Sequence, residues 1–223
     1  MSNNIDTKIR AIIDESFRQL ASYQNAEDSA LLNYGERKKV SQDQRLSDLN
    51  SEIEKVISLG LPNQVESFEK NSSPLLKYLD DPFVQGNKET NHLVELIKDV
   101  MEYLPWKYNY EERGENSNLG SYMGWAELIG PEAPYRTTKY CLGFTLISKG
   151  TLYPEHKHPA VEIYKVLSGT ADWTLEKVTT LRNPGEVILH PSNKIHKMQT
   201  YDETLLALYI WSGNDVVTLS SYV

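Results

Sequence analysis

The first hundred residues repeat apolar side chains at helical spacing. Apolar positions recur every three or four residues over 5–23, and the same spacing returns over 41–60 and 89–104. A serine opens the second segment, a glycine closes it, and Pro105 follows the third, all of which are typical helix boundaries. The pattern therefore predicts a helical N-terminal region.

After about residue 120 the pattern changes to short runs of β-branched and aromatic residues between turn residues. Such spacing, without helices between the runs, is typical of an all-β sandwich or barrel and disfavours a parallel βαβ sheet. We therefore predict an α+β protein, with a helical region over 1–115 and an antiparallel β-barrel over 116–223. Seven strands are expected, over 121–129, 138–148, 160–169, 171–181, 185–191, 196–201 and 204–213.

Composition narrows the class of protein. The chain has 223 residues and a net charge of −8, and it shows no basic patch of the kind that binds nucleic acid. No apolar run is long enough to predict a membrane span, and the N-terminus lacks the apolar stretch of a secretory signal. Cys141 is the single cysteine, so no intramolecular disulfide is expected. A cytoplasmic protein is the simplest interpretation, and a homodimer is left open.

The stretch "YPEHKHPAVEIYKVLSG" gathers ligand-type residues in one place. His156, His158 and Glu162 are all even-numbered, and alternate side chains of a strand share a face. These three side chains, and Tyr164 with them, are expected on one face if the strand stays regular through Pro159. A second stretch, "GEVILHPSNKIHKM", brings two more histidines. Imidazoles with one carboxylate suit a divalent transition metal with open coordination positions.

These residues resemble the first cupin motif, which runs glycine, five residues, His-x-His, three or four residues, glutamate, six residues, glycine. Gly150, His156, His158, Glu162 and Gly169 occupy all of its defined positions. The resemblance covers roughly residues 120–215. It implies a jelly-roll β-barrel with a metal inside.

The second cupin motif is matched less completely. Gly185, Pro191 and His196 stand at their positions, whereas Asn193 replaces a glycine and Thr200 replaces the final asparagine. Asparagine tolerates a left-handed turn better than most residues, so that substitution is mild. The ligands that the resemblance implies are His156, His158, Glu162 and His196.

Two histidines have no position in either motif. His190 falls in a predicted strand, and His92 lies near the start of a predicted helix. Because a lone histidine is more often a core or surface residue than a ligand, we interpret both as ordinary.

Two tyrosines flank the predicted ligands. A phenol with a reference pKa of about 10 becomes easier to ionise beside a divalent cation, and can then serve as a general base. Tyr164 follows Glu162 by two residues and shares its face, which favours Tyr164 as the base. Tyr153 has the opposite parity, so only a kink at Pro154 would turn it inward. The alternative for Tyr164 is core packing with a hydrogen-bonded hydroxyl.

The pattern Y-x-x-H-x-H-x-x-x-E-x-Y, with a later histidine, resembles the cupin-type dimethylsulfoniopropionate lyases. The stretch "HPAVEIYKVLSGTADW" looks most like their DddL branch, and the helical segment before the barrel is similar too. The resemblance implies a carbon–sulfur lyase that cleaves this zwitterion into dimethyl sulfide and acrylate. No redox change is required, so the implied metal is Fe²⁺, Zn²⁺, Mn²⁺, Co²⁺ or Ni²⁺.

A sulfonium substrate would need aromatic faces, which attract cations by roughly 0.5–2 kcal/mol each. Ordinary core packing explains any single one of the candidates equally well. The candidates for substrate binding are Trp125, Trp173, Tyr209, Trp211, Tyr140 and Tyr122.

Three other functions fit a metal cupin. A thiol or small-acid dioxygenase would use similar ligands but would require Fe²⁺ and oxygen. A non-catalytic metal sensor usually carries a DNA-binding domain, and the N-terminal helices show no basic recognition helix. A sugar-phosphate isomerase would need several cations for the phosphate. Those at hand are Lys139, Lys157, Lys165 and Arg136.

Overall fold

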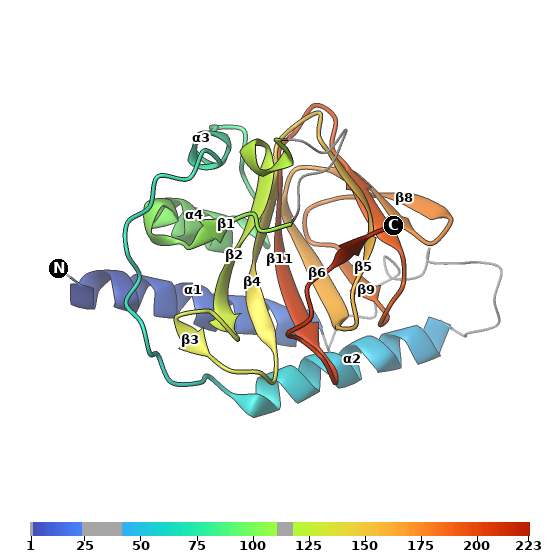
Figure 1. The fold of residues 1–223 in the computed structure, drawn as a ribbon, viewed down its shortest axis with the longest axis horizontal. Helices are drawn as coiled ribbons and strands as arrows, with labels where there is room; N and C mark the ends of the chain where they lie inside the picture. The colour runs from blue at the N-terminus through green and yellow to red at the C-terminus, as the bar shows by residue number, and fades with distance from the viewer. Residues whose placement is uncertain (1, 24–41, 111–117) are drawn as a thin grey trace.

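A computed structural model describes residues 2–23, 42–110 and 118–223 (Figure 1). Within these ranges no helix combines the length and the apolar character needed to cross a membrane. The helices are α1 (Ser2–Tyr23), α2 (Gln42–Leu59), α3 (Leu76–Leu79) and α4 (Asn91–Asp99), with 3-10 turns η2 (Met101–Tyr103) and η4 (Leu119–Ser121). The strands are β1 (Trp106–Lys107), β2 (Met123–Gly130), β3 (Tyr135–Arg136), β4 (Cys141–Ile147), β5 (Leu152–Lys157), β6 (Val161–Ser168), β7 (Ala171–Leu175), β8 (Val178–Arg182), β9 (Val187–His190), β10 (His196–Gln199), β11 (Leu205–Ser212) and β12 (Ser221–Tyr222).

The strands form two sheets that enclose the barrel interior. One sheet has the order β1-β2-β4-β11-β6-β9, with β3 beside β2, and the other has the order β12-β5-β10-β7-β8. Among the described strands every pairing is antiparallel except the short β2–β3 pair. Figure 1 shows the helices gathered beside and below the barrel. The predicted jelly-roll with a helical N-terminal region is therefore confirmed.

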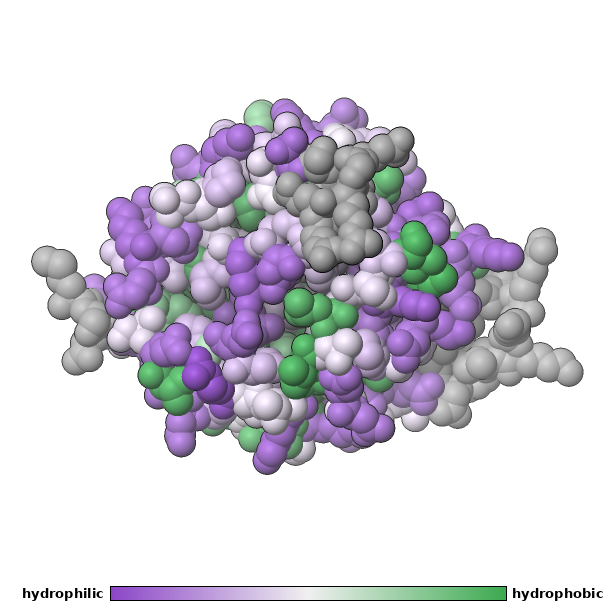
Figure 2. All heavy atoms as spheres, in the orientation of Figure 1, coloured by the Kyte–Doolittle hydropathy of each residue, from purple (hydrophilic) through white to green (hydrophobic). Residues whose placement is uncertain are grey.

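The larger sheet is covered on both faces. In β4, Leu142, Phe144 and Leu146 belong to the hydrophobic core shared with the helices, whereas Cys141 and Ile147 belong to the barrel interior. Since one face of β4 packs on helices and the other lines the barrel, every residue of the strand is buried. Figure 2 shows the resulting exterior on one face of the molecule, where hydrophilic side chains dominate and a few hydrophobic ones lie near the middle.

The structure divides the chain more finely than the sequence pattern does. The run expected as one strand over 171–181 is the hairpin β7–β8, which turns at Glu176 with φ 55°. β5 is an additional strand, outside the seven expected runs. β1 lies within the range 1–115 assigned to helices, yet it pairs with β2.

The turns of both cupin motifs adopt the backbone that their residues favour. Asn193 has φ 60°, the left-handed conformation that asparagine tolerates. Gly169 has φ 72°, and a Cβ there would collide with the Thr204 carbonyl. The motif glycine at 169 is thus required by both backbone angle and space.

Candidate metal centre and active-site pocket

The predicted ligands come from both sheets, not from one strand. His156 lies on β5 in the smaller sheet, and Glu162 lies on β6 in the larger sheet. The condition of one regular strand through Pro159 is not met: β5 ends at Lys157, and the chain enters the other sheet at Val161, since proline cannot donate a ladder hydrogen bond. His158 sits at this corner, just beyond the end of β5. The ligands therefore converge across the barrel interior and do not share one strand face.

Glu162 is the centre of the cluster and is fully enclosed. Its Oε1 atom accepts a hydrogen bond from the Trp211 indole at 2.7 Å. Its Oε2 atom lies 2.9 Å from His190 Nδ1, 3.1 Å from His158 Nε2 and 3.3 Å from His196 Nε2. Sheet register explains two of these contacts, since Trp211 and His190 are the cross-strand neighbours of Glu162 on either side.

Backbone carbonyls set the tautomer of three histidines. The Nδ1 atom of His156 lies 2.7 Å from the Pro154 carbonyl, and that of His196 lies 2.8 Å from the Lys194 carbonyl. His158 Nδ1 makes the same kind of contact, at 3.0 Å, with Ala160. A carbonyl only accepts, so each Nδ1 carries the proton and each neutral ring keeps its Nε2 lone pair for a ligand.

The arrangement calls for a cation. Ligand atoms of His158, Glu162 and His196 lie within 4.8 Å of one another, and all three residues are buried. The Nε2 atom of His196 makes no hydrogen bond, although it is buried. Two imidazole lone pairs facing one carboxylate oxygen repel it unless a cation or an added proton lies among them. The donor set therefore fits a divalent metal ion. His156 lies beside this trio, its ring centroid 4.1 Å from that of His196.

Electrostatics in the cluster follow from burial and from Glu162. Burial favours the neutral form of Glu162, but His158 and the other imidazoles outweigh it and hold the pKa of the carboxyl well below its usual range. Burial also opposes the charge on His158, yet Glu162 raises the pKa of that imidazole above 6.5. Burial and His196 lower the pKa of His156 far below its ordinary value, so it stays neutral, the form that binds metals.

His190 belongs to this site, contrary to its interpretation as an ordinary strand histidine. The Trp173 indole donates to His190 Nε2 at 2.8 Å. An indole nitrogen only donates, so Nε2 accepts and the proton sits on Nδ1, which donates to Glu162. Burial, with His196 beside it, lowers the pKa of His190 to about 3. Both ring nitrogens are occupied, so His190 orients the carboxylate and is not a ligand itself. Only the β6–β9 register reveals this role.

Replacing His190 should weaken metal binding without removing a ligand. We expect His190→Asn to lower metal affinity by about 10–100-fold, the usual cost of losing a partner that orients a ligand. Competition against a chromophoric chelator measures this. The exposed His92 provides the matched control, and His92→Asn should leave affinity unchanged. Unaltered affinity in a folded His190→Asn variant would contradict the orienting role.

A bulge in β5 turns Tyr153 into the barrel. His156 pairs with His196, but Tyr153 pairs with Met198, so two residues of β5, Pro154 and Glu155, lie opposite the single residue Lys197 of β10. The extra residue reverses the alternation, which is the inward turn that the sequence allowed for a kink at Pro154. The ring of Tyr153 stacks on that of His156 at 3.9 Å, and its hydroxyl donates to Tyr110 at 3.3 Å.

Tyr164 lies on the same face of β6 as Glu162. Its hydroxyl is 3.4 Å from Thr145 Oγ1, and its ring meets the edge of Trp173. Burial, reinforced by the charge of Glu162, raises the pKa of Tyr164 well above 10. Burial also raises that of Tyr153. Both phenols therefore stay protonated unless a positive charge lies near them.

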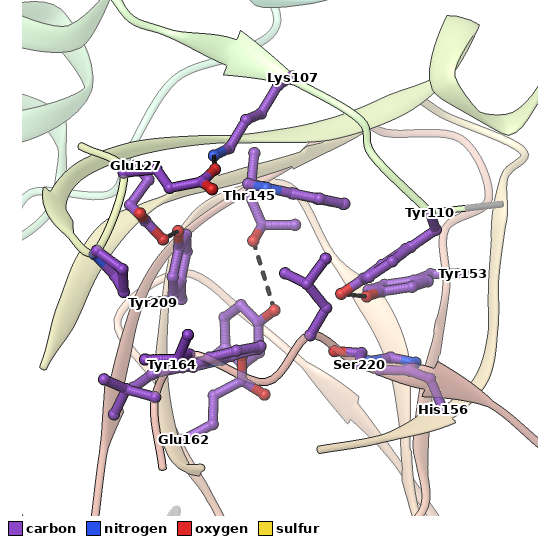
Figure 3. Close-up of a pocket in the computed structure, with 17 residues that line it drawn as sticks. Lys107, Tyr110, Glu127, Thr145, Tyr153, His156, Glu162, Tyr164, Tyr209 and Ser220 are labelled. Carbon is purple, nitrogen blue, oxygen red and sulfur yellow. Dashed lines mark hydrogen bonds and ion pairs between the residues drawn. The ribbon is translucent and has the colours of Figure 1, made fainter. Parts of the chain in front are cut away.

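One cavity of about 210 Å³ connects these groups (Figure 3). It is smaller than the roughly 300–1,000 Å³ pockets that hold drug-sized ligands, so it suits a small substrate. Of the sequence-predicted residues, those that line it are Tyr153, His156, Glu162, Tyr164, Trp125, Tyr209 and Trp211.

Three predicted substrate-binding residues do not line this cavity. Trp173 is fully buried and donates to His190. Tyr140 lies in the core shared with the helices, where its hydroxyl donates to the Gly60 carbonyl. Tyr122 is exposed at the end of η4, just before β2. In all three cases strand composition indicated an aromatic position but could not tell which face it would occupy.

The sequence analysis did not identify two other residues that line the cavity, Tyr110 and Glu127. Tyr110 comes from the segment after β1, where aromatic contacts with Trp125 and Tyr153 hold it over the cavity. Burial raises its pKa to about 12. Glu127 reaches the cavity from β2. The alternation of β2 could have pointed to Glu127, since it shares a face with Trp125.

The sequence matches the family model of the dimethylsulfoniopropionate lyases over residues 49–207. It is 31% identical over 110 residues to the dimethylsulfoniopropionate lyase DddQ of Ruegeria pomeroyi. The aligned segment covers 49% of this chain and 55% of that protein. It is 30% identical over 113 residues to the DddL protein of Cereibacter sphaeroides, which covers 50% and 47%. The matched region thus spans about half the length of these curated relatives.

Solved structures show the same fold over nearly the whole chain. A chain from the crystal structures of the dimethylsulfoniopropionate lyases RdDddP and RnDddQII superposes with a TM-score of 0.68 at 20% identity, covering 96% of this chain and 98% of that one. The crystal structure of DddQ from Ruegeria pomeroyi superposes with a TM-score of 0.65 at 24% identity, covering 94% and 97%. Because the family model matches more than half of this chain, the chain belongs to the dimethylsulfoniopropionate lyase family.

Proposed function

We propose that the protein cleaves dimethylsulfoniopropionate into dimethyl sulfide and acrylate by metal-assisted β-elimination, with Tyr164 as the general base. The observation that carries this proposal is that Glu162, the carboxylate of the buried ligand cluster, lines the same cavity as Tyr164. Family membership supports the choice of substrate.

The proposed ligands of one divalent ion are His156, His158, Glu162 and His196. Fe²⁺, Zn²⁺, Mn²⁺, Co²⁺ and Ni²⁺ all suit this nitrogen and oxygen donor set. When bound, the ion would supply Lewis-acid polarisation of the substrate carboxylate and the positive charge that favours phenolate over phenol. His190 and Trp211 would hold the Glu162 carboxylate in place through their hydrogen bonds.

The elimination then needs one proton acceptor. In its phenolate form, Tyr164 takes the proton from the carbon next to the substrate carboxylate, and the electrons of that C–H bond become the new C=C bond. The C–S bond breaks, and its electron pair leaves on sulfur as neutral dimethyl sulfide. Acrylate remains, and the proton stays on Tyr164. No oxidant or reductant is needed.

The remaining residues would position the substrate and exclude water. Tyr153 and Tyr110, joined by a hydrogen bond, wall the side of the cavity next to His156. The aromatic side chains that line the cavity keep water from much of its surface, which would strengthen the electrostatic interactions of the reaction.

Purified, metal-loaded protein should release dimethyl sulfide and acrylate in equal amounts from dimethylsulfoniopropionate. Headspace gas chromatography detects the sulfide and proton NMR detects acrylate. The rate should be the same under argon and in air, because elimination consumes no oxygen. A rate that requires oxygen would instead indicate the dioxygenase alternative, and release of neither product would refute the proposal.

A further inference from the structure

Trp173 is the largest fully buried side chain within the described ranges, and it carries a single polar atom. It lies on β7 in the smaller sheet, between Met198 of β10 and Thr180 of β8. Its indole nitrogen reaches across the barrel interior to His190, at the end of β9 in the larger sheet, and donates to Nε2 at 2.8 Å. An apolar ring would fill the same space without a donor, so the N–H of Trp173 points to a task besides packing.

This hydrogen bond decides which nitrogen of His190 carries the proton. A neutral imidazole has one N–H and one lone pair. Since Nε2 accepts from the indole, the N–H is at Nδ1, 2.9 Å from the Oε2 atom of Glu162. In the other tautomer the Nδ1 lone pair would face that oxygen and repel it, and the Nε2–H would point at the indole N–H. Trp173 therefore excludes the tautomer that would push the Glu162 carboxylate away.

The Oε2 atom of Glu162 is the one that the other imidazoles share. The Nε2 atom of His158 lies 3.1 Å from it, and that of His196 lies 3.3 Å from it. A donor on the His190 side occupies one lone pair of this oxygen and leaves the other for the ion that these groups would hold. The chain of contacts from Trp173 through His190 thus carries the orientation of the carboxylate from the smaller sheet to the larger one.

The same indole ring also touches the proposed base. Tyr164 meets Trp173 close to edge-on, with ring centroids 4.9 Å apart and planes at 66°. Two residues earlier on β6 lies Glu162, whose partner on β9 is His190. One side chain of β7 therefore contacts the proposed base directly and reaches the proposed ligand through His190.

We propose that Trp173 is a positioning residue. Its N–H holds the His190 proton on Nδ1 and so orients Glu162, and its ring holds Tyr164 in place beside that carboxylate. The part that concerns Tyr164 rests on the proposed function. The part that concerns His190 and Glu162 is tested without the reaction.

Nuclear magnetic resonance tests the His190 proton in the unaltered, Zn²⁺-loaded protein. Long-range proton–nitrogen correlation spectra distinguish a ring nitrogen that carries a proton from one that does not, and the His190→Asn variant identifies the His190 signals. His190 should carry its proton on Nδ1. A proton on Nε2 would overturn the proposal without any variant of Trp173.

Trp173→Phe removes the donor and keeps an aromatic ring. We expect the Nε2-protonated form of His190 to appear in this variant, because Nε2 no longer has to accept. Trp106→Phe is the matched control and should leave the His190 signals unchanged. Trp106 is also buried, in the core shared with the helices, and donates its indole N–H to the Met101 carbonyl.

A second replacement covers the case in which Trp173→Phe does not fold. Inserted at this position alone, β-(3-benzothienyl)alanine keeps the bicyclic shape and replaces the N–H by sulfur. It should release the His190 tautomer in the same way. An unchanged tautomer in a folded protein that lacks the indole N–H would refute the proposal.

Metal affinity tests whether the effect passes through His190. Trp173→Phe should lower the affinity for Zn²⁺ by about 5-fold, roughly the value of one neutral hydrogen bond, in competition against a chromophoric chelator. The same change in a His190→Asn background should have no further effect, because the imidazole that links the indole to Glu162 is gone. Equal losses in both backgrounds would show that Trp173 acts through general packing, which would contradict the positioning role.

The outcomes separate this proposal from the proposed reaction. If the two variants are coupled in metal affinity but the protein releases no dimethyl sulfide, the link to Glu162 stands and the reaction is wrong. If dimethyl sulfide is released but the two variants act independently, the reaction stands and the link is wrong. When both hold, Trp173→Phe should lower kcat more than it raises KM, because Trp173 does not line the cavity. An unchanged kcat in the folded variant would refute the hold on Tyr164.

Discussion

Tyr164→Phe should lower the turnover of dimethylsulfoniopropionate by at least about 10²-fold, the low end for loss of a general base. Phenylalanine keeps the ring that packs against Trp173 and removes only the hydroxyl near Thr145. The fold and the metal content should therefore stay as they are. Substrate affinity should change far less than turnover. Steady-state kinetics at saturating metal, with metal analysis of the same samples, measures both quantities.

Tyr153→Phe is the matched control, because Tyr153 lines the same cavity and is equally buried. If Tyr153 only positions the substrate, its loss should mainly raise KM. Near-normal turnover in Tyr164→Phe with collapse in Tyr153→Phe would assign the base to Tyr153, a role that the β5 bulge makes accessible to it. Normal turnover in both variants would remove the tyrosinate mechanism.

Removing the metal should abolish activity, and adding it back should restore activity. Chelator-treated protein should turn over at the background rate, and His196→Ala should lower metal affinity by more than about 100-fold, beyond the cost of losing an outer partner. The His196 Nε2 atom is buried without a hydrogen bond, so a metal ion is its fitting partner. Full activity in metal-stripped protein would contradict the metal-assisted reaction.

Metal binding should also weaken as the pH falls. His158 is held protonated to a higher pH than usual by Glu162 in the metal-free protein, and the metal must displace that proton. Affinity should therefore begin to fall near or above pH 6.5 and continue falling in acid, because each imidazole binds metal only in its neutral form. Chelator competition across pH 5–8 measures the slope. The variant His156→Ala in the same assay shows whether His156, which lies beside His158, Glu162 and His196, is also a ligand.

The sequence by itself determined the elements and most of the candidate metal site. The change from helical spacing to short strands near residue 120 agrees with the structure. The motif spacing identified His158, Glu162 and His196, whose ligand atoms lie close together inside the barrel. Motif glycines were readable because a left-handed turn restricts the residue that can occupy it, and Asn193 adopts that turn as expected. Such features depend on local backbone and side-chain preferences, which a short stretch of sequence carries.

Only the tertiary structure decided which side chains meet in the cavity. His190 reaches Glu162 because β9 pairs with β6, and Glu127 joins the row of Tyr164 because β2, β4 and β11 align in register. The bulge in β5 turned Tyr153 to the inner face of the strand. At Pro159 the chain passes from one sheet to the other, so the ligands lie on two strands and not on one. Register and bulges depend on partners far away in the chain, so no periodicity within one strand can specify them.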